Sequence, residues 1–414
     1  MTSSNFTVAK SSLALRMIFL SYAVALVLKK ITGFQDGIVD IAVLLLIFLT
    51  LTVKPRHFVQ GVRSLIRENV FKAFLIFGLY FVCSAYFSYN TKNLIALEFI
   101  SVLKWLIYFF CGYLFAFTYE LKNPVFPLKN DMMCGVIFVL LYSMMFYNWS
   151  GISSNVGDLF GFYDNSFESI FSLRSVFALF AFIVFIYALN AVGISSVSKW
   201  FLLSSSFVFL FMSGNRKMLI AFFLVALLMK MHGRYQRVIR LIMYCAAAGV
   251  LIVMTQSLLF DQSIDEYSNV DQPRMRTYII SYEIAKDYFP FGSGPATFAS
   301  KGSMENYSHI YSDYGLDGVY GFEEFGDIFF YNDTYWAQVI GQYGVVGLVL
   351  FAFIIFYLFR FVSGANLIIT HERLIFIVLF LSAFTPALQR IELGLFLFFM
   401  IGLHAQNNKL RLKG

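Results

Sequence analysis

Long apolar runs constrain this chain more than any other feature of its sequence. Each run is close to the roughly 20 residues that a helix needs to cross the hydrocarbon of a bilayer, and short polar links separate the runs from end to end. Only 13% of the residues are charged and 59% are hydrophobic, whereas soluble domains are about one quarter charged. The sequence therefore predicts an all-α polytopic membrane protein.

About twelve transmembrane helices are expected from the runs. Their ranges are 13–28, 38–53, 70–87, 94–117, 132–147, 170–189, 200–212, 218–229, 238–260, 335–359, 374–387 and 391–404. Basic residues gather in links such as 54–72 and 230–240, so the positive-inside rule predicts that this side, and both termini, are cytoplasmic. The net charge of +7 lies mostly in such links. We therefore expect membrane lipid as a partner and no nucleic acid.

The chain divides into three parts on this basis. Residues 1–260 hold helices 1–9, residues 261–334 form one large loop outside the cytoplasm, and residues 335–414 hold helices 10–12 and a cytoplasmic tail. The loop has 13 acidic and four basic residues. Residues 274–288 are predicted to form an amphipathic helix that begins near Pro273 and buries the apolar positions 275, 278, 279 and 282. The aromatic, acidic segment after Gly294 is expected to cover a hydroxyl-rich ligand.

Three short motifs occur in a fixed order along the chain. The loop holds Arg276, Pro290 and a Gly-x-Gly turn followed by Phe298, the next span opens on Asp333-Thr-Tyr-Trp, and a polar corner earlier in the chain contains Ser213 and Arg216. Their order and placement resemble the O-antigen ligase and polymerase superfamily. In the ligases of that superfamily the second motif opens with His-Asn. Asp333 stands in that place here, as in Wzy-type polymerases.

The resemblance implies a GT-C-like glycosyltransferase of the bacterial inner (cytoplasmic) membrane with its large loop in the periplasm. Such a polymerase moves a growing glycan from undecaprenyl diphosphate onto a lipid-linked repeat unit. The partners implied are an undecaprenyl-diphosphate-linked oligosaccharide and a possible chain-length regulator protein. The transfer is metal-independent in this family, so neither a metal nor another cofactor is expected.

Basic side chains are the candidates for holding the leaving diphosphate, because a guanidinium pairs bidentately with phosphate oxygens. Arg216 and the weaker candidate Lys217 lie in the polar corner, where the alternative for Arg216 is an anchoring role. Arg276 fills the family position in the loop. Arg274 lies two residues away, so both cannot point the same way on one helix, and one of them is free to pair with a loop carboxylate instead.

Arg174 lies a few residues inside the sixth span, where a charge is costly and a functional role is the default interpretation. A structural ion pair with Glu168 or Asp158 is the alternative. Lys104 and Glu98 lie in the fourth span, six residues apart and poorly placed to pair directly. Lys104 is the weaker candidate for reaching a polar cavity.

Asp333 is the candidate general base for the acceptor hydroxyl, and capping of the following helix is the alternative. Tyr335 is a candidate for stacking on a sugar, and the interfacial aromatic belt is the alternative. Within the superfamily a ligase that transfers glycan to lipid A-core remains the closest competing function. A lipid-linked glycan flippase or transporter is the competing function from another class. Transporters usually show repeat symmetry and charged residues near the bilayer midplane, which disfavours this function here.

Overall fold

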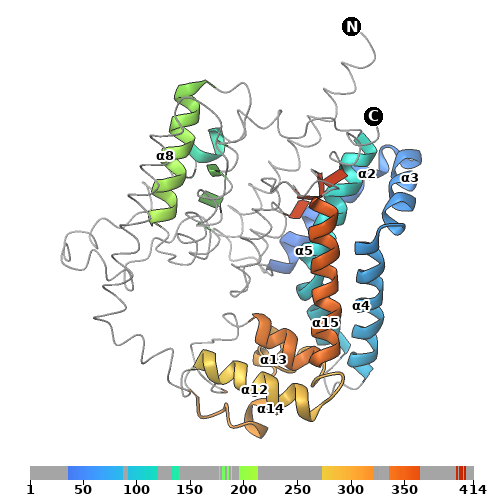
Figure 1. Cartoon of the computed structure of the whole chain (residues 1–414), viewed down its shortest axis with the longest axis vertical. Coiled ribbons are helices and arrows are strands. Elements are labelled where there is room, and N and C mark those ends of the chain that lie inside the picture. Colours follow the sequence, from blue (N-terminus) through green and yellow to red (C-terminus); the bar gives the residue numbers. More distant parts are fainter. Residues whose placement is uncertain are drawn as a thin grey trace, which may run out of the picture.

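The computed structural model describes residues 36–86, 92–119, 195–212, 273–319 and 335–363, with shorter stretches within 133–139, 177–188, 322–324 and 398–406. Regular structure in these parts of the chain is entirely helical, without a β-strand. The helices, shown in Figure 1, are α2 (Asp36–Thr52), α3 (Pro55–Ile66), α4 (Asn69–Tyr86), α5 (Lys92–Tyr119), α8 (Ser196–Met212), α12 (Pro273–Asp287), α13 (Lys301–Glu305), α14 (Ile310–Asp313) and α15 (Tyr335–Ser363). The predicted all-α class is confirmed for the described residues.

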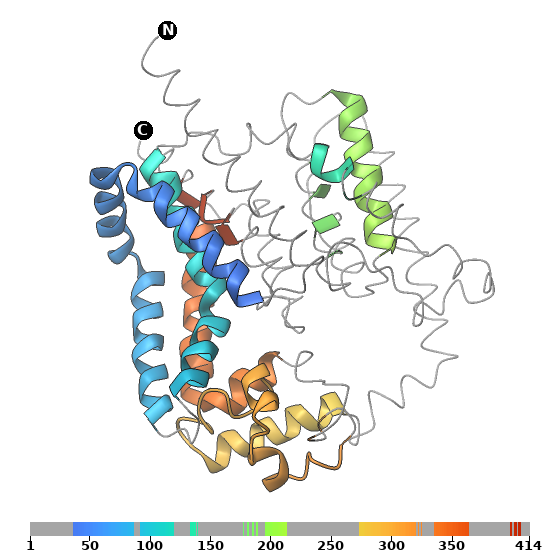
Figure 2. The same ribbon diagram turned by 180° about the vertical axis from the view of Figure 1, so that it is seen from behind.

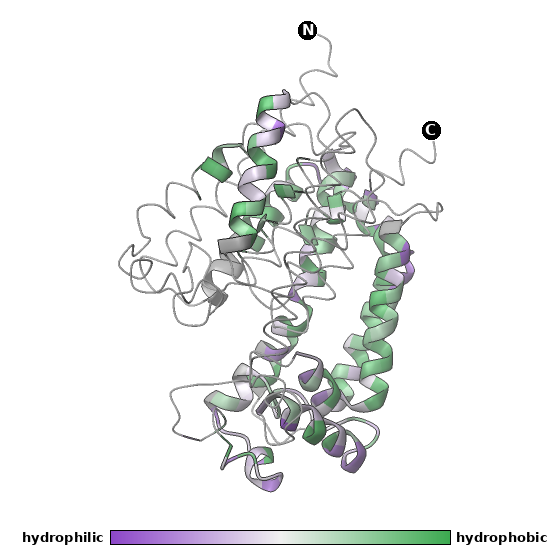
Figure 3. Ribbon diagram, turned by 60° about the vertical axis from the view of Figure 1, so that its left-hand side comes forward, coloured by the Kyte–Doolittle hydropathy of each residue, from purple (hydrophilic) through white to green (hydrophobic). Residues whose placement is uncertain are grey.

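Three of these helices are long and apolar enough to cross a membrane, namely Asn69–Tyr86, Leu94–Tyr119 and Tyr335–Phe361. They coincide with the third, fourth and tenth predicted spans. The shortest has 18 residues, which at 1.5 Å per residue is about 27 Å and so approaches the thickness of the hydrocarbon core. Figure 3 shows hydrophobic residues along the long upright helices and more hydrophilic ones in the helices below them. The total of about twelve spans stays a prediction.

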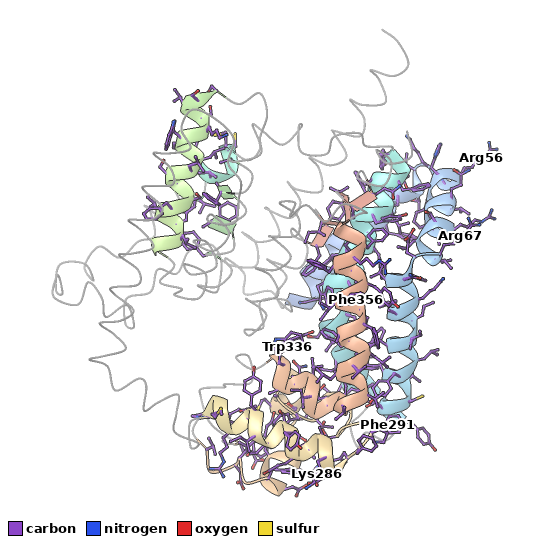
Figure 4. The ribbon with its side chains drawn as sticks, in the orientation of Figure 1. Arg56, Arg67, Lys286, Phe291, Trp336 and Phe356 are labelled. Atoms are coloured by element: carbon purple, nitrogen blue, oxygen red, sulfur yellow. The ribbon has the colours of Figure 1, made fainter. Side chains whose placement is uncertain are left out.

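The basic segment 54–72 and the large loop lie at opposite ends of α4 (Figure 1). Most of the basic segment forms α3, an amphipathic helix that buries Gly61 and Leu65 and packs against α5. Arg56 and Arg67 project outward at this end of the bundle, far from Lys286 of the loop (Figure 4). This arrangement is what a loop and a basic link on opposite sides of a membrane require. The side on which each one lies remains a prediction.

α4, α5 and α15 share an aromatic core. The ring of Phe77 on α4 lies 5.7 Å from that of Tyr343 and 5.8 Å from that of Phe351, both edge-on. Trp105 on α5 lies 6.0 Å from Phe351. α2 crosses α5 on the other side of the bundle, as Figure 2 shows. Because lipid tails are as apolar as these side chains, the helices associate by close packing rather than by escape from water.

The described part of the large loop folds into a compact unit with a core of its own. α12 packs along α15, and the Tyr314 hydroxyl donates a 2.8 Å hydrogen bond to Asp287, which ties α14 to the end of α12. Buried residues from α12, α13, α14, the turns between them and α15 make up the core: Ile280, Ile284, Phe298, Ala299, Met304, Ile310, Tyr311, Leu316, Val319, Phe322 and Ala337. The core therefore joins the loop to the helical bundle.

The predicted amphipathic helix 274–288 is observed as α12, but it buries a different face. Met275 and Tyr282 are 46% and 69% exposed, whereas Thr277, Ser281 and Ile284 are buried. The two hydroxyls donate to backbone carbonyls of their own helix, at 2.6 and 2.7 Å, so these small side chains can be buried without an unpaired polar group. The predicted apolar stripe is thus wrong at its two ends, because hydropathy does not register how closely a small residue lets helices approach.

Candidate functional site

α15 is broken at Gly344, whose φ of 62° and ψ of −168° are not helical. Residues 335–343, called the half-helix below, precede the break. Figure 4 places Trp336 at the far end of a short helical segment that extends sideways from the foot of the upright helix bearing Phe356. The predicted span 335–359 is therefore interrupted. The 19 residues that follow Gly344 in α15 rise about 28 Å, enough to cross most of the hydrocarbon core without the half-helix.

The Gly-x-Gly turn of the loop binds to the broken helix. The backbone N–H of Ser293 donates to the Gly341 carbonyl and that of Gly294 to the Gln342 carbonyl, each at 3.0 Å. The carbonyls just before a helix break lose their usual intrahelical donors. The loop turn supplies new ones, so the turn and the half-helix form one hydrogen-bonded unit.

Glycine is required on both sides of this contact. Gly292 has a φ of +72°, and a Cβ there would lie 2.5 Å from the Gly341 carbonyl oxygen. A Cβ on Gly344 would lie 2.5 Å from the Pro290 carbonyl oxygen. Side-chain-bearing residues avoid this backbone region, and no Cβ fits at those distances. These motif glycines therefore allow two backbones to touch.

α4 holds the same turn from the other side. The Tyr80 hydroxyl lies 2.6 Å from the Tyr343 carbonyl oxygen and 3.0 Å from that of Pro290, and donates toward both. The Ser84 hydroxyl donates to the Phe291 carbonyl at 3.2 Å. Polar side chains on a predicted span thus satisfy loop carbonyls, a role that the sequence did not indicate.

A buried carboxyl group lies where α5, the half-helix and the loop meet. Glu98 on α5 is 5% exposed, and the Gln338 side-chain amide donates a short hydrogen bond to its Oε1. Ser300 and Gln342 also face this carboxyl group. Gly302 of α13 lies over it, since a Cβ on that glycine would lie 3.9 Å from Glu98 Oε2.

Four buried polar atoms around Glu98 have no hydrogen-bond partner among the described residues. They are Trp105 Nε1, the Tyr335 hydroxyl, Gln342 Oε1 and the Tyr343 hydroxyl. The Tyr335 hydroxyl faces the Trp105 indole without the geometry of a hydrogen bond. Unpaired groups of this kind are rare in folded proteins. These four hydrogen-bond donors and acceptors therefore lie inside the protein, next to the loop.

Hydrogen bonds link the residues on the loop side of this cluster to one another. Ser300 and Ser303 form a capping box at the start of α13, and Ser303 Oγ lies 2.7 Å from the Tyr311 hydroxyl. That hydroxyl accepts a 2.9 Å hydrogen bond from the Ala299 N–H. Burial raises the pKa of Tyr311, so its hydroxyl stays protonated and can donate. The Gln342 amide completes the connection by donating to the Phe298 carbonyl at 2.6 Å.

Among the predicted site residues, Arg276 and Tyr335 are described with their side chains. Arg276 is partly buried on α12 and donates a 3.0 Å hydrogen bond to the Gly315 carbonyl. Tyr335 is 1% exposed and packs against Phe351, 6.0 Å between ring centroids. Arg276 therefore contacts the loop, whereas Tyr335 contacts the upright part of α15. Of Arg274 only the backbone, within α12, is described.

The remaining predicted site residues lie outside the described residues: Asp333, Arg216, Lys217 and Arg174. Their roles stay predictions. The structure does describe the segment next to Asp333, because the half-helix begins two residues after it. Phe298, at the start of the predicted cover segment, is 0% exposed and belongs to the core of the loop.

A comparison with protein families bears on this arrangement. Residues 200–352 match the family model described as O-antigen ligase. The resemblance to the O-antigen polymerase and ligase superfamily is confirmed. The matched segment runs through the large loop, the Gly-x-Gly turn and the half-helix, and it also includes the polar corner with Arg216. No curated protein matches the chain. Together with the apolar helices, the superfamily match indicates a membrane protein of polysaccharide biosynthesis.

The described part of the chain contains no group of three or more His, Cys, Asp or Glu residues that could hold a metal ion. Its most distinctive polar group is the set Glu98, Gln338 and Gln342, which was not predicted as a site. Two signals were present. A carboxylate inside an apolar span is a functional candidate by default, and two glutamines spaced four apart share one helix face.

Proposed function

We propose that the protein is a surface-polysaccharide (O-antigen) polymerase of the bacterial inner membrane. It transfers a growing glycan from undecaprenyl diphosphate to a hydroxyl group of a new lipid-linked repeat unit at the periplasmic face. The observation that carries the proposal is the superfamily match over residues 200–352, which contains Arg216, Arg276 and Asp333 in one segment. The match gives the flippase or transporter alternative no support.

The reaction sets two tasks for the side chains. The C–O bond between the donor sugar and the diphosphate breaks, so negative charge develops on the leaving group and must be stabilised by fixed positive charge. Arg216 and Arg276 take this task, with Arg274, Lys217 and Arg174 as further contacts. A guanidinium has five N–H donors, so the hydrogen bond from Arg276 to Gly315 leaves donors for phosphate oxygens. The transfer uses no metal in this proposal.

The acceptor hydroxyl must lose its proton as the new glycosidic bond forms. Asp333 is positioned in the sequence to take that proton, since it directly precedes the half-helix that docks onto Glu98 and the loop turn. The transferred chain and the released undecaprenyl diphosphate balance the reaction. Tyr335 stays a proposed substrate contact, and both its ring and its hydroxyl are buried in the described part of the structure.

Asp333 supports polymerase over ligase, because the ligases of the superfamily have histidine at that position. The two activities differ in acceptor, so the decisive assay offers both acceptors to the purified full-length protein in phospholipid nanodiscs. With lipid-linked repeat units alone we expect a ladder of longer glycans. With lipid A-core as second acceptor we expect no glycosylated lipid A-core. Modification of lipid A-core would establish the ligase instead.

Variants test the site in the same assay. Arg216→Ala and Arg276→Ala should each abolish the ladder, while Arg56→Ala, at the opposite end of α4, should leave it unchanged. Arg276→Lys keeps a positive charge and one donor toward Gly315 but loses the bidentate fork. It therefore separates the effect of the charge from the effect of bidentate hydrogen bonding. Normal ladders from both alanine variants at normal protein levels would refute the site assignment.

A further inference from the structure

The buried Glu98 connects three parts of the site at once. Its helix, α5, belongs to the bundle, its hydrogen-bond donor Gln338 belongs to the half-helix, and Gly302 and Ser300 beside it belong to the loop. Glu98 is 5% exposed and Gln338 is 2% exposed. A carboxyl group at such a depth in an apolar helix costs considerable free energy, whereas leucine would pack there without that cost.

Among the described residues, the half-helix also makes polar contacts with the loop and with α4. Its Gln342 amide donates to the loop at Phe298, and its last carbonyl receives Tyr80 of α4. Toward α5, both Gln338 and Gln342 face the Glu98 carboxyl group, and Gln338 donates a hydrogen bond to its Oε1. The half-helix is therefore fixed at its end by Tyr80 and near its start by Glu98, and the start is the end that adjoins Asp333.

We propose that Glu98 is a positioning residue of the polymerase site, which holds the half-helix through Gln338 and so fixes the chain segment that contains Asp333. The catalytic part of this inference rests on the proposed function. Glu98 does not touch the reacting atoms. It acts because a catalytic group displaced by about 1 Å can cost about 100-fold in rate, and the hydrogen bond from Gln338 adds to the packing of Tyr335 and Trp336 on Phe351 in holding the start of the half-helix.

The test exchanges the two partners. Glu98→Ala removes the acceptor, and Gln338→Glu sets two carboxyl groups against each other. The double variant Glu98→Gln with Gln338→Glu restores an amide facing a carboxyl group, with donor and acceptor reversed. Glu98→Gln alone keeps an oxygen acceptor at the same place. Glu283→Ala, an exposed carboxylate of α12, is the matched control.

Two measurements are made on each full-length variant in nanodiscs. The first is trypsin cleavage at Lys286 and Lys301, which reports whether the loop stays docked without reference to activity. The second is the kcat and KM for extension of lipid-linked repeat units. We expect Glu98→Ala and Gln338→Glu to lower kcat by about 100-fold with little change in KM and to speed cleavage. The exchanged pair should recover most of both.

Unchanged kcat and cleavage in Glu98→Ala would overturn the inference. So would equal losses in Gln338→Glu and the exchanged pair, because the pairing would then not matter. Should the wild-type protein fail to extend the repeat unit while cleavage still follows the pairing, the proposed function fails. The holding of the half-helix by Glu98 would then be supported on its own.

Discussion

Replacement of Gly344 by alanine should release the loop turn from α15. The residue sits at φ 62° and ψ −168°, a region that is essentially restricted to glycine and costs other residues about 1–3 kcal/mol. The new Cβ would also lie 2.5 Å from the Pro290 carbonyl oxygen and 2.7 Å from the Gly292 nitrogen. These are backbone atoms that cannot rotate away, so the docked state becomes less stable relative to the undocked one.

The magnitude follows from the contacts that hold the turn. A loss of about 1–3 kcal/mol shifts a two-state equilibrium by about 5- to 150-fold. Undocking would also break the hydrogen bonds from the Ser293 and Gly294 N–H groups to α15. Each is worth about 0.5–1.5 kcal/mol. The free energy gained when the strain at Gly344 is relieved is therefore comparable to the free energy lost with these two hydrogen bonds. The variant is then expected to populate the undocked loop rather than to unfold.

Amide hydrogen exchange of the full-length protein in nanodiscs measures this directly. The Ser293 and Gly294 amides should exchange about 5- to 150-fold faster in Gly344→Ala than in the wild type. Gly78→Ala is the control, because it lies on α4 and a Cβ there meets nothing within 4 Å. Unchanged exchange at the two amides would refute the break in α15 as the docking site for the loop.

Three further predictions use the same preparation. Tyr80→Phe removes the donor to one loop carbonyl, that of Pro290, and to the Tyr343 carbonyl of the half-helix. It should destabilise the docked loop by about 1 kcal/mol, seen as faster exchange of the turn; unchanged exchange would contradict it. Gly112→Ala places a Cβ 2.0 Å from the Phe399 carbonyl oxygen and should lower the thermal midpoint clearly, and an equal midpoint would mean that α5 does not approach Phe399 so closely. Because burial raises the pKa of Tyr311, its neutral form stabilises the loop below pH about 10 and this stabilisation declines as the pH rises further. Tyr311→Phe should flatten the alkaline fall in loop stability between pH 9 and pH 11, and a parallel fall in both proteins would exclude Tyr311 as its source.

The gross architecture was accessible from the sequence because lipid imposes a simple rule. A backbone in hydrocarbon must satisfy its own hydrogen bonds, so long apolar runs become helices, and α4, α5 and α15 as a whole begin and end close to the expected residues. α12 was also found within one residue at each end, since Pro273 is suited to a first helical turn. The superfamily could be recognised because its motif residues keep their order along the chain.

The face that α12 buries could not be predicted in the same way. Thr277 and Ser281 are buried because their small hydroxyls bond to the backbone of their own helix, while the apolar Met275 and Tyr282 remain exposed. A hydropathy pattern records the transfer of a side chain out of water. It does not record which part of the protein will pack against that side chain.

The sequence by itself determined that the chain is helical and apolar and which superfamily it resembles, because these properties depend on local composition and order. Only the tertiary structure decided that α15 breaks at Gly344, that Gly292 and Gly344 allow contact between two backbones, and that Glu98 meets Gln338. Residues 98 and 338 lie 240 positions apart, and their pairing depends on how three helices and a loop pack together, which no local pattern encodes.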